Sequence, residues 1–220
     1  MSGRNQRDET GYLSQRLRMV DDQLRRRDIV DAAVLAVMST VPRHEFVPPE
    51  MIDEAYEDHP VPIGCDQTIS QPYIVASMTQ EMGVGPESVV LEIGTGCGYQ
   101  TAVLAEIVKH VYSIEIIPEL LAEAEERLKR LGYANISTRL GNGALGWPEH
   151  APYDGILAAA AAYEIPPALI EQLADNGKMV IPLVTGGGYH QDLVLVTKSG
   201  GQISQQTLYG VRFVPLRSGG

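Results

Sequence analysis

A glycine-rich turn between two patterned segments constrains the fold of this chain more than any other feature. Residues 89–93 (VVLEI) form a short apolar run, which is typical of a buried parallel strand, and the glycines of residues 92–98 (EIGTGCG) follow directly. Residues 99–108 then show the apolar spacing of a helix. Doubly wound α/β sheets bind ligands at such strand-to-helix turns, where glycines let the main chain come close to a bound molecule. We therefore expect an α/β protein with a ligand site at this turn.

The same alternation of strand and helix patterns continues toward the end of the chain. Strands that alternate with helices predict a doubly wound, mostly parallel sheet. A final pair of strands, joined through Gly200-Gly201, is predicted to form a hairpin. The further strands are expected at 111–115, 136–140, 154–158, 179–183, 193–197 and 203–208, and the helices between them at 118–131 and 167–173.

The length of the chain allows one domain with an N-terminal extension. With 220 residues, of which 44% are hydrophobic, it can bury one sizeable core. We expect a disordered tail over residues 1–15, a helical and loop extension over 16–85, and an α/β core with a C-terminal β segment over 86–220. Within the extension, helices are expected at 17–24, 29–41 and 73–82, and the Pro- and Gly-rich stretch 42–72 is expected to be mostly loop.

Composition and charge exclude several classes of function. The formal net charge is -11, whereas nucleic-acid binders usually show a basic patch. The N-terminus lacks the apolar stretch of a signal peptide or membrane span, so a cytoplasmic protein is expected. Cys65 and Cys97 lie far apart, and the histidines lack the spacing of metal ligands, so neither a disulfide nor a metal site is expected.

The residues around the glycine turn favour a nucleoside over a dinucleotide. The dinucleotide motif needs a third glycine where this chain has Tyr99, so a pyrophosphate at the helix N-terminus is disfavoured. Glu115 closes the next expected strand, 21 residues after Gly94, where a carboxylate can accept hydrogen bonds from both ribose hydroxyls. A purely structural turn is the alternative, but the later turn Gly141-Asn142-Gly143 adds to the case for adenosine.

Several segments of the chain resemble those of one enzyme family. They are residues 19–24 (MVDDQL), 41–48 (VPRHEFVP), 67–72 (QTISQP), 91–96 (LEIGTG), 146–148 (GWP), 151–154 (APYD) and 211–216 (VRFVPL). From about Met19 to Leu216 the chain thus resembles the bacterial protein-L-isoaspartate (D-aspartate) O-methyltransferases. The glycine motif alone indicates only class I methyltransferases, whereas residues 67–72 are specific to this family.

The resemblance implies a class I S-adenosylmethionine-dependent methyltransferase fold, with a doubly wound, mostly parallel, seven-stranded sheet and a small N-terminal helical extension. It implies methyl transfer from S-adenosylmethionine to the side-chain carboxylate of L-isoaspartyl residues in damaged proteins, which starts repair through a succinimide; D-aspartyl acceptors are left open. Ser70 matches the active-site serine of the family and is expected beside the methyl donor. The expected donor-binding residues are Thr68, Glu92, Gly94, Thr95, Gly96, Gly98, Glu115, Asn142 and Gly143, and the expected substrate-binding residues are Ile69, Ser70, Val211 and Phe213.

Three positions depart from the family pattern. Asn142 stands where the family usually has Asp near the adenine, and its amide can still present an acceptor while adding a donor. Cys97 replaces the usual small residue of the glycine turn and is similar in size to serine. Ala159 stands where Thr or Gly is more usual, at the floor of the acceptor pocket.

The chemistry implied by the resemblance requires placement of the acceptor rather than a general base. An isoaspartyl carboxylate is ionised at pH 7, because its reference pKa is about 3.9. Ser70 is therefore expected to orient the carboxylate as a hydrogen-bond donor, since no His-Asp arrangement that would activate it as a nucleophile is evident. A helix-capping serine before Pro72 is the alternative. Residues 211–215 are expected to be extended, either as an edge strand that ends at Pro215 or as a strand to which a substrate peptide adds.

Other functions stay open on the sequence alone. A close alternative is an O-methyltransferase that modifies a normal aspartate of one dedicated precursor peptide, and a more distant one is a non-catalytic module that binds S-adenosylmethionine. A nucleic-acid methyltransferase is disfavoured by the acidic charge and by residues 159–162 (AAAA), which stand where amino-group methylators carry a Pro-rich motif. The expected partners are isoaspartyl proteins and peptides, with no nucleic acid and no membrane, and the protein is expected to be a monomer.

Overall fold

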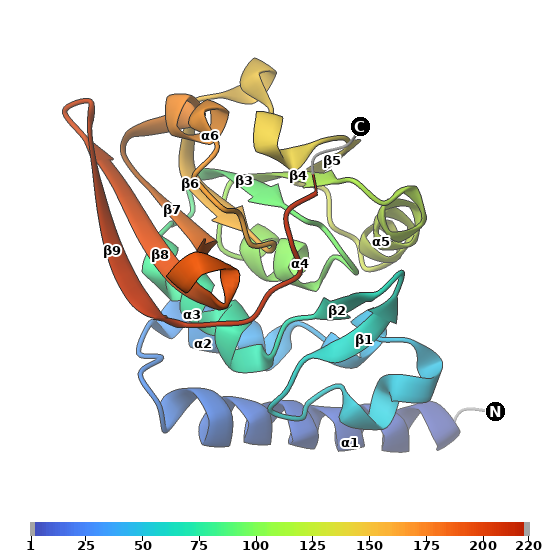
Figure 1. The fold of residues 1–220 in the computed structure, drawn as a ribbon. Coiled ribbons are helices and arrows are strands. Elements are labelled where there is room, and N and C mark those ends of the chain that lie inside the picture. The colour runs from blue at the N-terminus through green and yellow to red at the C-terminus, as the bar shows by residue number, and fades with distance from the viewer. Residues whose placement is uncertain (1–2, 218–220) are drawn as a thin grey trace.

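A seven-stranded sheet with helices on both faces forms the body of the protein, and a separate two-stranded hairpin lies beside it (Figure 1). The computed structural model describes residues 3–217, with the main chain alone at residues 3–10. The α-helices are α1 (Gly3–Met19), α2 (Ala32–Thr40), α3 (Pro72–Met82), α4 (Tyr99–Ala105), α5 (Pro118–Arg130) and α6 (Pro167–Gln172). The strands are β1 (Val61–Gly64), β2 (Gln67–Ile69), β3 (Val89–Ile93), β4 (His110–Glu115), β5 (Ile136–Leu140), β6 (Tyr153–Ala158), β7 (Leu173–Thr185), β8 (His190–Ser199) and β9 (Gln202–Gly210).

The strand order of the large sheet is β5-β4-β3-β6-β7-β8-β9. Strands β3 to β7 run parallel to one another, and β8 and β9 continue the sheet as antiparallel strands at one edge. This arrangement confirms the predicted doubly wound, mostly parallel architecture. The final hairpin lies where the sequence predicts it, although β7 is longer than the expected strand 179–183 and β9 extends past 203–208 at both ends.

Alternate residues of the central strands face opposite sides of the sheet, as the two-residue period of a strand requires. On one side, Val90 and Val180 are buried in the cluster that also contains residues of α2, α3, α4 and α5. On the other side, Leu91 and Met179 pack in a second cluster with Leu169 of α6. Both faces of the sheet are therefore covered, and its carboxyl-terminal edge is the place left for a site.

The chain changes direction across the sheet between β3 and β6. From β3 it proceeds outward to β4 and β5, and it then returns to place β6 on the other side of β3. Ligands bind at such a switch point, beyond the carboxyl ends of the strands. The glycine turn follows β3 there, and Ala159 follows β6, with its N–H donating to the Ile93 carbonyl oxygen at 2.8 Å.

The N-terminal region differs from the expected disordered tail over residues 1–15. Helix α1 begins at Gly3 and continues into a π-helical turn, η1 (Val20–Arg25). Tyr12 stacks on His44 with their ring centroids 3.9 Å apart. Figure 1 shows α1 lying along one face of the molecule, beyond α2 and the small hairpin. Contacts of its second half, through Tyr12 and the buried Met19, hold α1 on the rest of the protein.

Part of the expected loop 42–72 forms the hairpin of β1 and β2. The two strands pair antiparallel, and the turn residues Cys65 and Asp66 have φ angles of 52° and 57°, as in a tight two-residue hairpin turn. Val61 and Ile69 are buried in the core, which holds the hairpin on the body of the protein. The prolines and glycines of this stretch predict loop, whereas the burial of these apolar residues against the core stabilises the strands.

Candidate active site

A cleft opens at the switch point, between the glycine turn, the end of β4 and the hairpin. Gly94 and Gly96 line it with φ angles of +94° and +54°, a left-handed backbone that favours glycine. A side chain at Gly96 would stand 3.4 Å from Ile63 of the hairpin. Ile114 and Gly143 complete the wall next to the turn. The glycine turn thus leaves room for a ligand directly against the main chain.

Glu115 lies at the end of β4 and lines this cleft. Its Oε2 accepts a hydrogen bond from the main-chain N–H of Gly96 at 2.8 Å, and its Oε1 accepts from the N–H groups of Ile116 and Ile117 at 2.8 and 3.0 Å. These bonds fix the carboxylate against the glycine turn. Because the two oxygens of a carboxylate offer about four acceptor positions, Glu115 retains capacity for a ligand hydroxyl.

Glu92 does not line the cleft, although it directly precedes the glycine turn. It is fully buried on the side of the sheet that faces α4, where its Oε2 accepts from the hydroxyls of Thr101 and Ser113 at 2.6 Å each. The hydroxyls of Ser113 and Thr95 share a further hydrogen bond of 2.6 Å. Glu92 and Thr95, both expected to bind the donor, thus support the turn from beneath, because the alternation along β3 directs Glu92 toward the helices.

Three other expected binding residues also lie outside the walls of the described cleft. Gly98 is the N-cap of α4, with a φ of +88°. Asn142 caps a short helical turn by accepting from the N–H of Ala144 at 2.9 Å. The side chain of Ile69 is 3% exposed and packs in the core, because Thr68 takes the outward position on this strand. In this structure none of the three lines the cleft.

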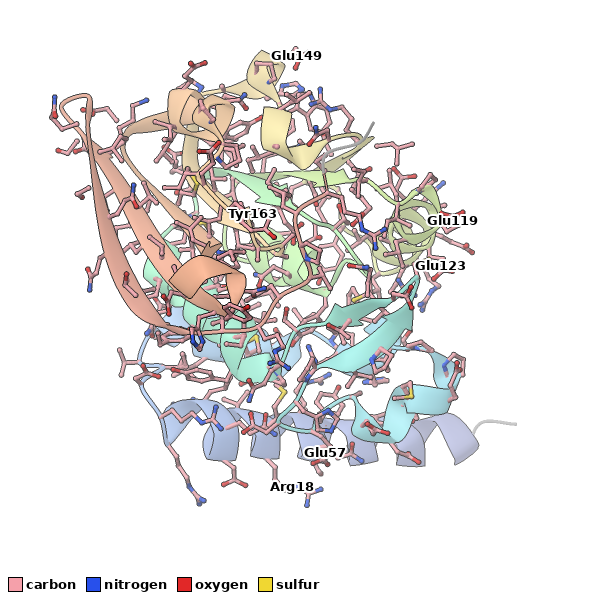
Figure 2. All side chains as sticks on the ribbon, in the orientation of Figure 1. Arg18, Glu57, Glu119, Glu123, Glu149 and Tyr163 are labelled. Carbon is pink, nitrogen blue, oxygen red and sulfur yellow. The ribbon has the colours of Figure 1, made fainter. Side chains whose placement is uncertain are left out.

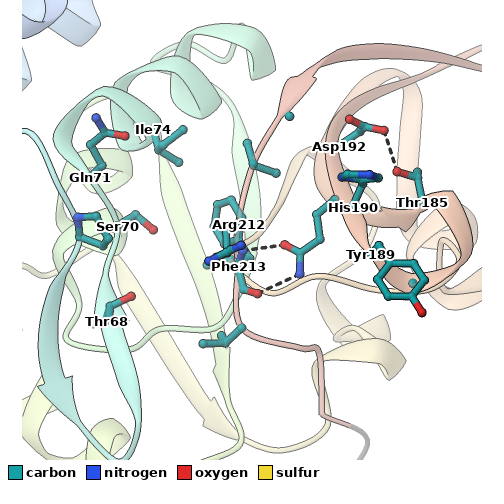
Figure 3. Close-up of a pocket in the computed structure, with 17 residues that line it drawn as sticks. Thr68, Ser70, Gln71, Ile74, Thr185, Tyr189, His190, Asp192, Arg212 and Phe213 are labelled. Atoms are coloured by element: carbon teal, nitrogen blue, oxygen red, sulfur yellow. Dashed lines mark hydrogen bonds between the residues drawn. The ribbon is translucent and has the colours of Figure 1, made fainter.

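A second, larger cavity of about 1050 Å³ adjoins the cleft. The loop after β2, the start of α3, the loop before β8 and residues 210–214 form its walls (Figure 3). Ser70 lies on one side, and Phe213 lies across from it on the other. Val211 and Phe213, both expected to bind substrate, therefore line this cavity together with Ser70.

Ser70 lies between β2 and α3 and is half-buried. The N-cap of α3 is Gln71, which makes no capping hydrogen bond through its side chain, so the helix-capping alternative for Ser70 is wrong. The Ser70 carbonyl oxygen accepts from the guanidinium of Arg43 at 2.8 Å. Among the described residues the Ser70 hydroxyl has no hydrogen-bond partner, so it is available to a molecule in either cavity.

The two cavities meet at Thr68, Ser70, Ala159 and Val214, which line both of them. A group that passes from a molecule in the cleft to a molecule in the larger cavity must pass between these residues. Among residues 11–217, whose side chains the structure describes, no three acidic, histidine or cysteine side chains gather in a way that could hold a metal ion. The geometry therefore suits the transfer of a small group between two bound molecules at this junction.

Comparison with known proteins identifies the family. A family model described as Protein-L-isoaspartate(D-aspartate) O-methyltransferase (PCMT) matches residues 14–220. The chain belongs to this family. A protein-L-isoaspartate O-methyltransferase of Gloeobacter violaceus is 52% identical to it over 198 residues, which make up 90% of this chain and 96% of the relative.

Two solved structures of protein-L-isoaspartate O-methyltransferases are also similar. One aligns with a TM-score of 0.84 at 25% identity and covers 94% of this chain, which spans 66% of that longer protein. The other, from Plasmodium falciparum and described as a complex with S-adenosyl-L-homocysteine, aligns with a TM-score of 0.81 at 29% identity over 93% of this chain and 99% of that one. Together the matches confirm the predicted family, the methyltransferase fold, the enzyme class and the use of S-adenosylmethionine.

Some residues of the methyltransferase cleft were not predicted from the sequence. Ile114 and Ile117 lie at and after the end of β4, so the strand-end rule that indicates Glu115 also applies to them. Val214 and Leu216 come from the end of the chain and line the same cleft. No local signal connects these two residues with a glycine turn more than a hundred positions earlier.

The outer surface of the methyltransferase carries many of its acidic side chains. Figure 2 shows Glu57, Glu119, Glu123 and Glu149 at the periphery, and all of them are exposed. This distribution agrees with the net charge of -11, which disfavours a nucleic-acid partner. In the described part of the chain, no helix has the length and apolar character needed to cross a membrane.

Glu92→Gln is expected to stabilise the methyltransferase at neutral pH. Burial raises the pKa of Glu92 to about 7, the hydrogen bonds from Ser113 and Thr101 oppose this rise in part, and the charge of Glu115 adds to it. Glu92 Oε1 has no partner in the described structure, so the neutral acid is the form that fits this environment. Glutamine is a neutral side chain of the same shape and keeps an acceptor for both hydroxyls.

The pH dependence distinguishes this effect from general stabilisation. The folded pKa is above the ordinary value of 4.5, so the stability contributed by protonated Glu92 is present below pH 4.5 and is lost as the pH rises toward 7. The difference in melting temperature between Glu92→Gln and wild type should therefore increase by several degrees from pH 4.5 to pH 7. For a protein of this length, about 1 kcal/mol of stability corresponds to about 2 to 4 °C in melting temperature. A difference that stays constant with pH would contradict a protonated Glu92.

Proposed function

We propose that this chain transfers a methyl group from S-adenosylmethionine to the side-chain carboxylate of L-isoaspartyl residues in damaged proteins and peptides, which starts their repair through a succinimide. The observation that carries the proposal is the junction of the two cavities, which Thr68, Ser70, Ala159 and Val214 share. It brings a site suited to the donor next to a site suited to a peptide, with an unpaired hydroxyl between them.

The cleft at the glycine turn suits S-adenosylmethionine, which when bound supplies an electrophilic methyl group on a sulfonium centre. Glu115 has acceptor capacity left for a ribose hydroxyl. Gly94 and Gly96 admit a ligand against the main chain, and Ile114 and Ile117 offer apolar contact for an adenine ring. A nucleoside without phosphates fits this set of residues, because acceptor oxygens and apolar side chains dominate it.

Ser70 places the acceptor carboxylate. This carboxylate is ionised at neutral pH and needs no general base, so alignment with the methyl donor is what the protein has to provide. The Ser70 hydroxyl is unpaired in the described structure and lines both cavities, so it can donate a hydrogen bond to the carboxylate at their junction. A fixed donor in a partly enclosed cavity replaces water that would otherwise compete for the same oxygen.

The extended segment 211–215 offers its main chain to the rest of the peptide. The N–H and carbonyl oxygen of Phe213 are both taken by the side-chain amide of Gln191, at 2.6 and 3.1 Å. The N–H and carbonyl oxygen of Arg212 and the N–H of Val214 have no partner among the described residues. A peptide that pairs with this edge as an added strand would be bound through its main chain, whatever its side chains are.

This mode of peptide binding predicts that main-chain methylation of the substrate weakens binding. N-methylation of single amides within two residues of the isoaspartate should raise KM about 10-fold at one position or more, since a lost hydrogen bond with an unpaired partner costs about 1 to 3 kcal/mol. Peptides N-methylated only near their far ends serve as controls. A KM that is unchanged at every position would contradict strand addition.

The experiment that tests the function is methyl transfer from labelled S-adenosylmethionine to two short peptides that differ only in isoaspartate or aspartate at one position. Label in a base-labile ester on the isoaspartyl peptide alone is the expected result. Label on the aspartyl peptide would favour a tailoring enzyme for normal aspartate, and donor binding without label on either would favour a binding module. A third peptide with D-aspartate tests the wider acceptor range.

The setting in which the enzyme works follows from the same proposal. Isoaspartyl proteins and peptides are its partners, and the acidic surface argues against nucleic acid and against an anionic membrane surface as partners. We propose that the enzyme is cytoplasmic. We also propose that it is monomeric, because both cavities are formed by one copy of the chain. Light scattering of the purified protein with and without donor measures the oligomeric state.

A further inference from the structure

Arg43 is fully buried and contacts three segments that are far apart in the sequence. It begins the short helical turn η2 (Arg43–Phe46). Its Nε donates to the Ala55 carbonyl oxygen at 2.6 Å, and its Nη2 donates to the Ser70 carbonyl oxygen at 2.8 Å. The guanidinium lies over the ring of Tyr99, 4.8 Å from the ring centroid. One side chain thus joins the N-terminal extension, α4 and the loop of residues 70–71 between β2 and α3, called the acceptor loop below.

Stability alone does not favour an arginine at this position. Among the side chains that the structure describes, those of residues 11–217, Arg43 forms no ion pair with a carboxylate, and its Nη1 has no hydrogen-bond partner. Removing a cation from water without an anionic partner is costly, and a hydrophobic side chain of similar volume is often at least as stabilising in a core. The two bonds that Arg43 does make therefore point to its role.

The bond to Ser70 fixes a peptide group that the nearby secondary structure leaves free. The first main-chain bond of α3 runs from the Val75 N–H to the Gln71 carbonyl oxygen, so the Ser70 carbonyl lies just before the helix. The N–H groups of Tyr73 and Ile74, which would bind this carbonyl in a turn or a longer helix, make no bond to it. Arg43 is the partner that the structure gives to the Ser70 carbonyl oxygen, so it holds the peptide plane from which the Ser70 side chain extends.

The contact between Arg43 and Tyr99 links the position of this peptide plane to the donor site. Tyr99 is buried and is the first residue of α4, directly after Gly98 of the glycine turn. A planar guanidinium that stacks on an aromatic ring has a defined orientation, which a lysine cannot reproduce. The position of the Ser70 main chain is therefore set relative to the start of α4 and not only by its own loop.

We propose that Arg43 is a positioning residue for methyl transfer: it fixes the Ser70 main chain against the start of α4, so that the Ser70 hydroxyl is held at the junction of the two cavities. This inference rests on the proposed role of Ser70. Arg43 itself touches neither cavity, so its effect on the reaction passes through Ser70 and should vanish when the hydroxyl is absent.

The test is a double-mutant cycle between Arg43 and Ser70. Arg43→Lys and Arg43→Gln are each made alone and together with Ser70→Ala, and kcat and KM for an isoaspartyl peptide are measured with the affinity for S-adenosylhomocysteine. Each Arg43 variant should lower kcat about 10-fold when Ser70 is present, because a misplacement of about 1 Å can cost up to about 100-fold. In the Ser70→Ala background the same change should alter kcat by less than about 2-fold.

Arg16→Lys is the matched control. Arg16 Nε also donates to a main-chain carbonyl oxygen, that of Ser39 at 2.9 Å, but it contacts no residue of the acceptor loop. This variant should leave kcat unchanged in both backgrounds. Lysine would leave an unpaired buried charge at position 43, so Arg43→Lys can fail to fold. Arg43→Gln leaves no buried cation and is then the variant used for the test.

The outcomes separate this inference from the role of Ser70. If Ser70→Ala lowers kcat, and an Arg43 variant lowers kcat by the same factor with and without the Ser70 hydroxyl, Arg43 acts on folding or on another group. The inference is then wrong. An Arg43 variant that weakens cofactor affinity as much as it lowers kcat would also overturn it. If Ser70→Ala keeps full activity, the proposed role of Ser70 is wrong, and the proposal that Arg43 positions the Ser70 hydroxyl is wrong as well.

Discussion

Replacing Ser70 with alanine is expected to lower kcat by about 10- to 100-fold, while the affinity for S-adenosylmethionine stays within about 2-fold of wild type. A hydrogen bond to a charged group contributes about 1.5 to 3 kcal/mol, and each 1.4 kcal/mol corresponds to about a factor of 10 in rate. The hydroxyl has no partner among the described residues, so its loss leaves no buried group unsatisfied and should cost little stability.

The loss should appear in kcat because the bond orients the acceptor for reaction. Single-turnover assays with saturating isoaspartyl peptide measure this step directly. Ser39→Ala is a suitable control, because the Ser39 hydroxyl donates to the Leu35 carbonyl oxygen within α2, away from both cavities, and its removal should leave kcat unchanged. A Ser70→Ala enzyme as fast as wild type would remove Ser70 from the mechanism.

Enlarging Ala159 to leucine is expected to lower kcat/KM by at least about 100-fold. Ala159 lines both cavities, and its N–H is bonded to the Ile93 carbonyl oxygen at 2.8 Å, so its main chain cannot easily move away. A Cβ built at Gly94 would stand 3.5 Å from the Ala159 Cβ, so the Ala159 side chain faces the glycine turn. The added carbons therefore have to occupy the junction, and displacement of reacting groups by about 1 Å can cost about 100-fold.

Ala159→Gly is the matched control for size. It keeps the junction open and should retain activity within about 3-fold, which is less than about 1 kcal/mol in the barrier. Melting temperatures and donor affinity of both variants show whether the leucine disturbs more than the junction. Full activity in Ala159→Leu would mean that the methyl group does not pass beside this residue.

The glycine turn and Glu115 could be located from the sequence because their signals are local. An apolar run, glycines and a helical pattern follow one another over residues 89–108, and Glu115 ends the next strand. The same reasoning did not separate Glu115, which lines the cleft, from Glu92, which is buried beneath it. Both are strand residues next to the turn, and only the direction in which each side chain points distinguishes them.

The acceptor side depended on more than local patterns. Ser70 was singled out through its resemblance to the active-site serine of a family, since no periodicity in residues 42–72 indicates a catalytic position. The hairpin that carries this loop lies in the stretch 42–72 that is expected to be mostly loop, and α1 (Gly3–Met19) covers most of the expected tail over residues 1–15. For the hairpin, the burial of Val61 and Ile69 against the core, which a one-dimensional pattern does not contain, stabilises the strands.

The sequence by itself determined the α/β class, the order of strands and helices in the core, and the place of a ligand cleft at the glycine turn, because these follow from residues that are neighbours along the chain. Only the tertiary structure decided that Val214 meets Ala159 and Ser70 at one junction, and that Arg43 holds the Ser70 main chain. These contacts join segments that come together when the sheet and the extension pack, and close packing of many side chains at once sets their geometry.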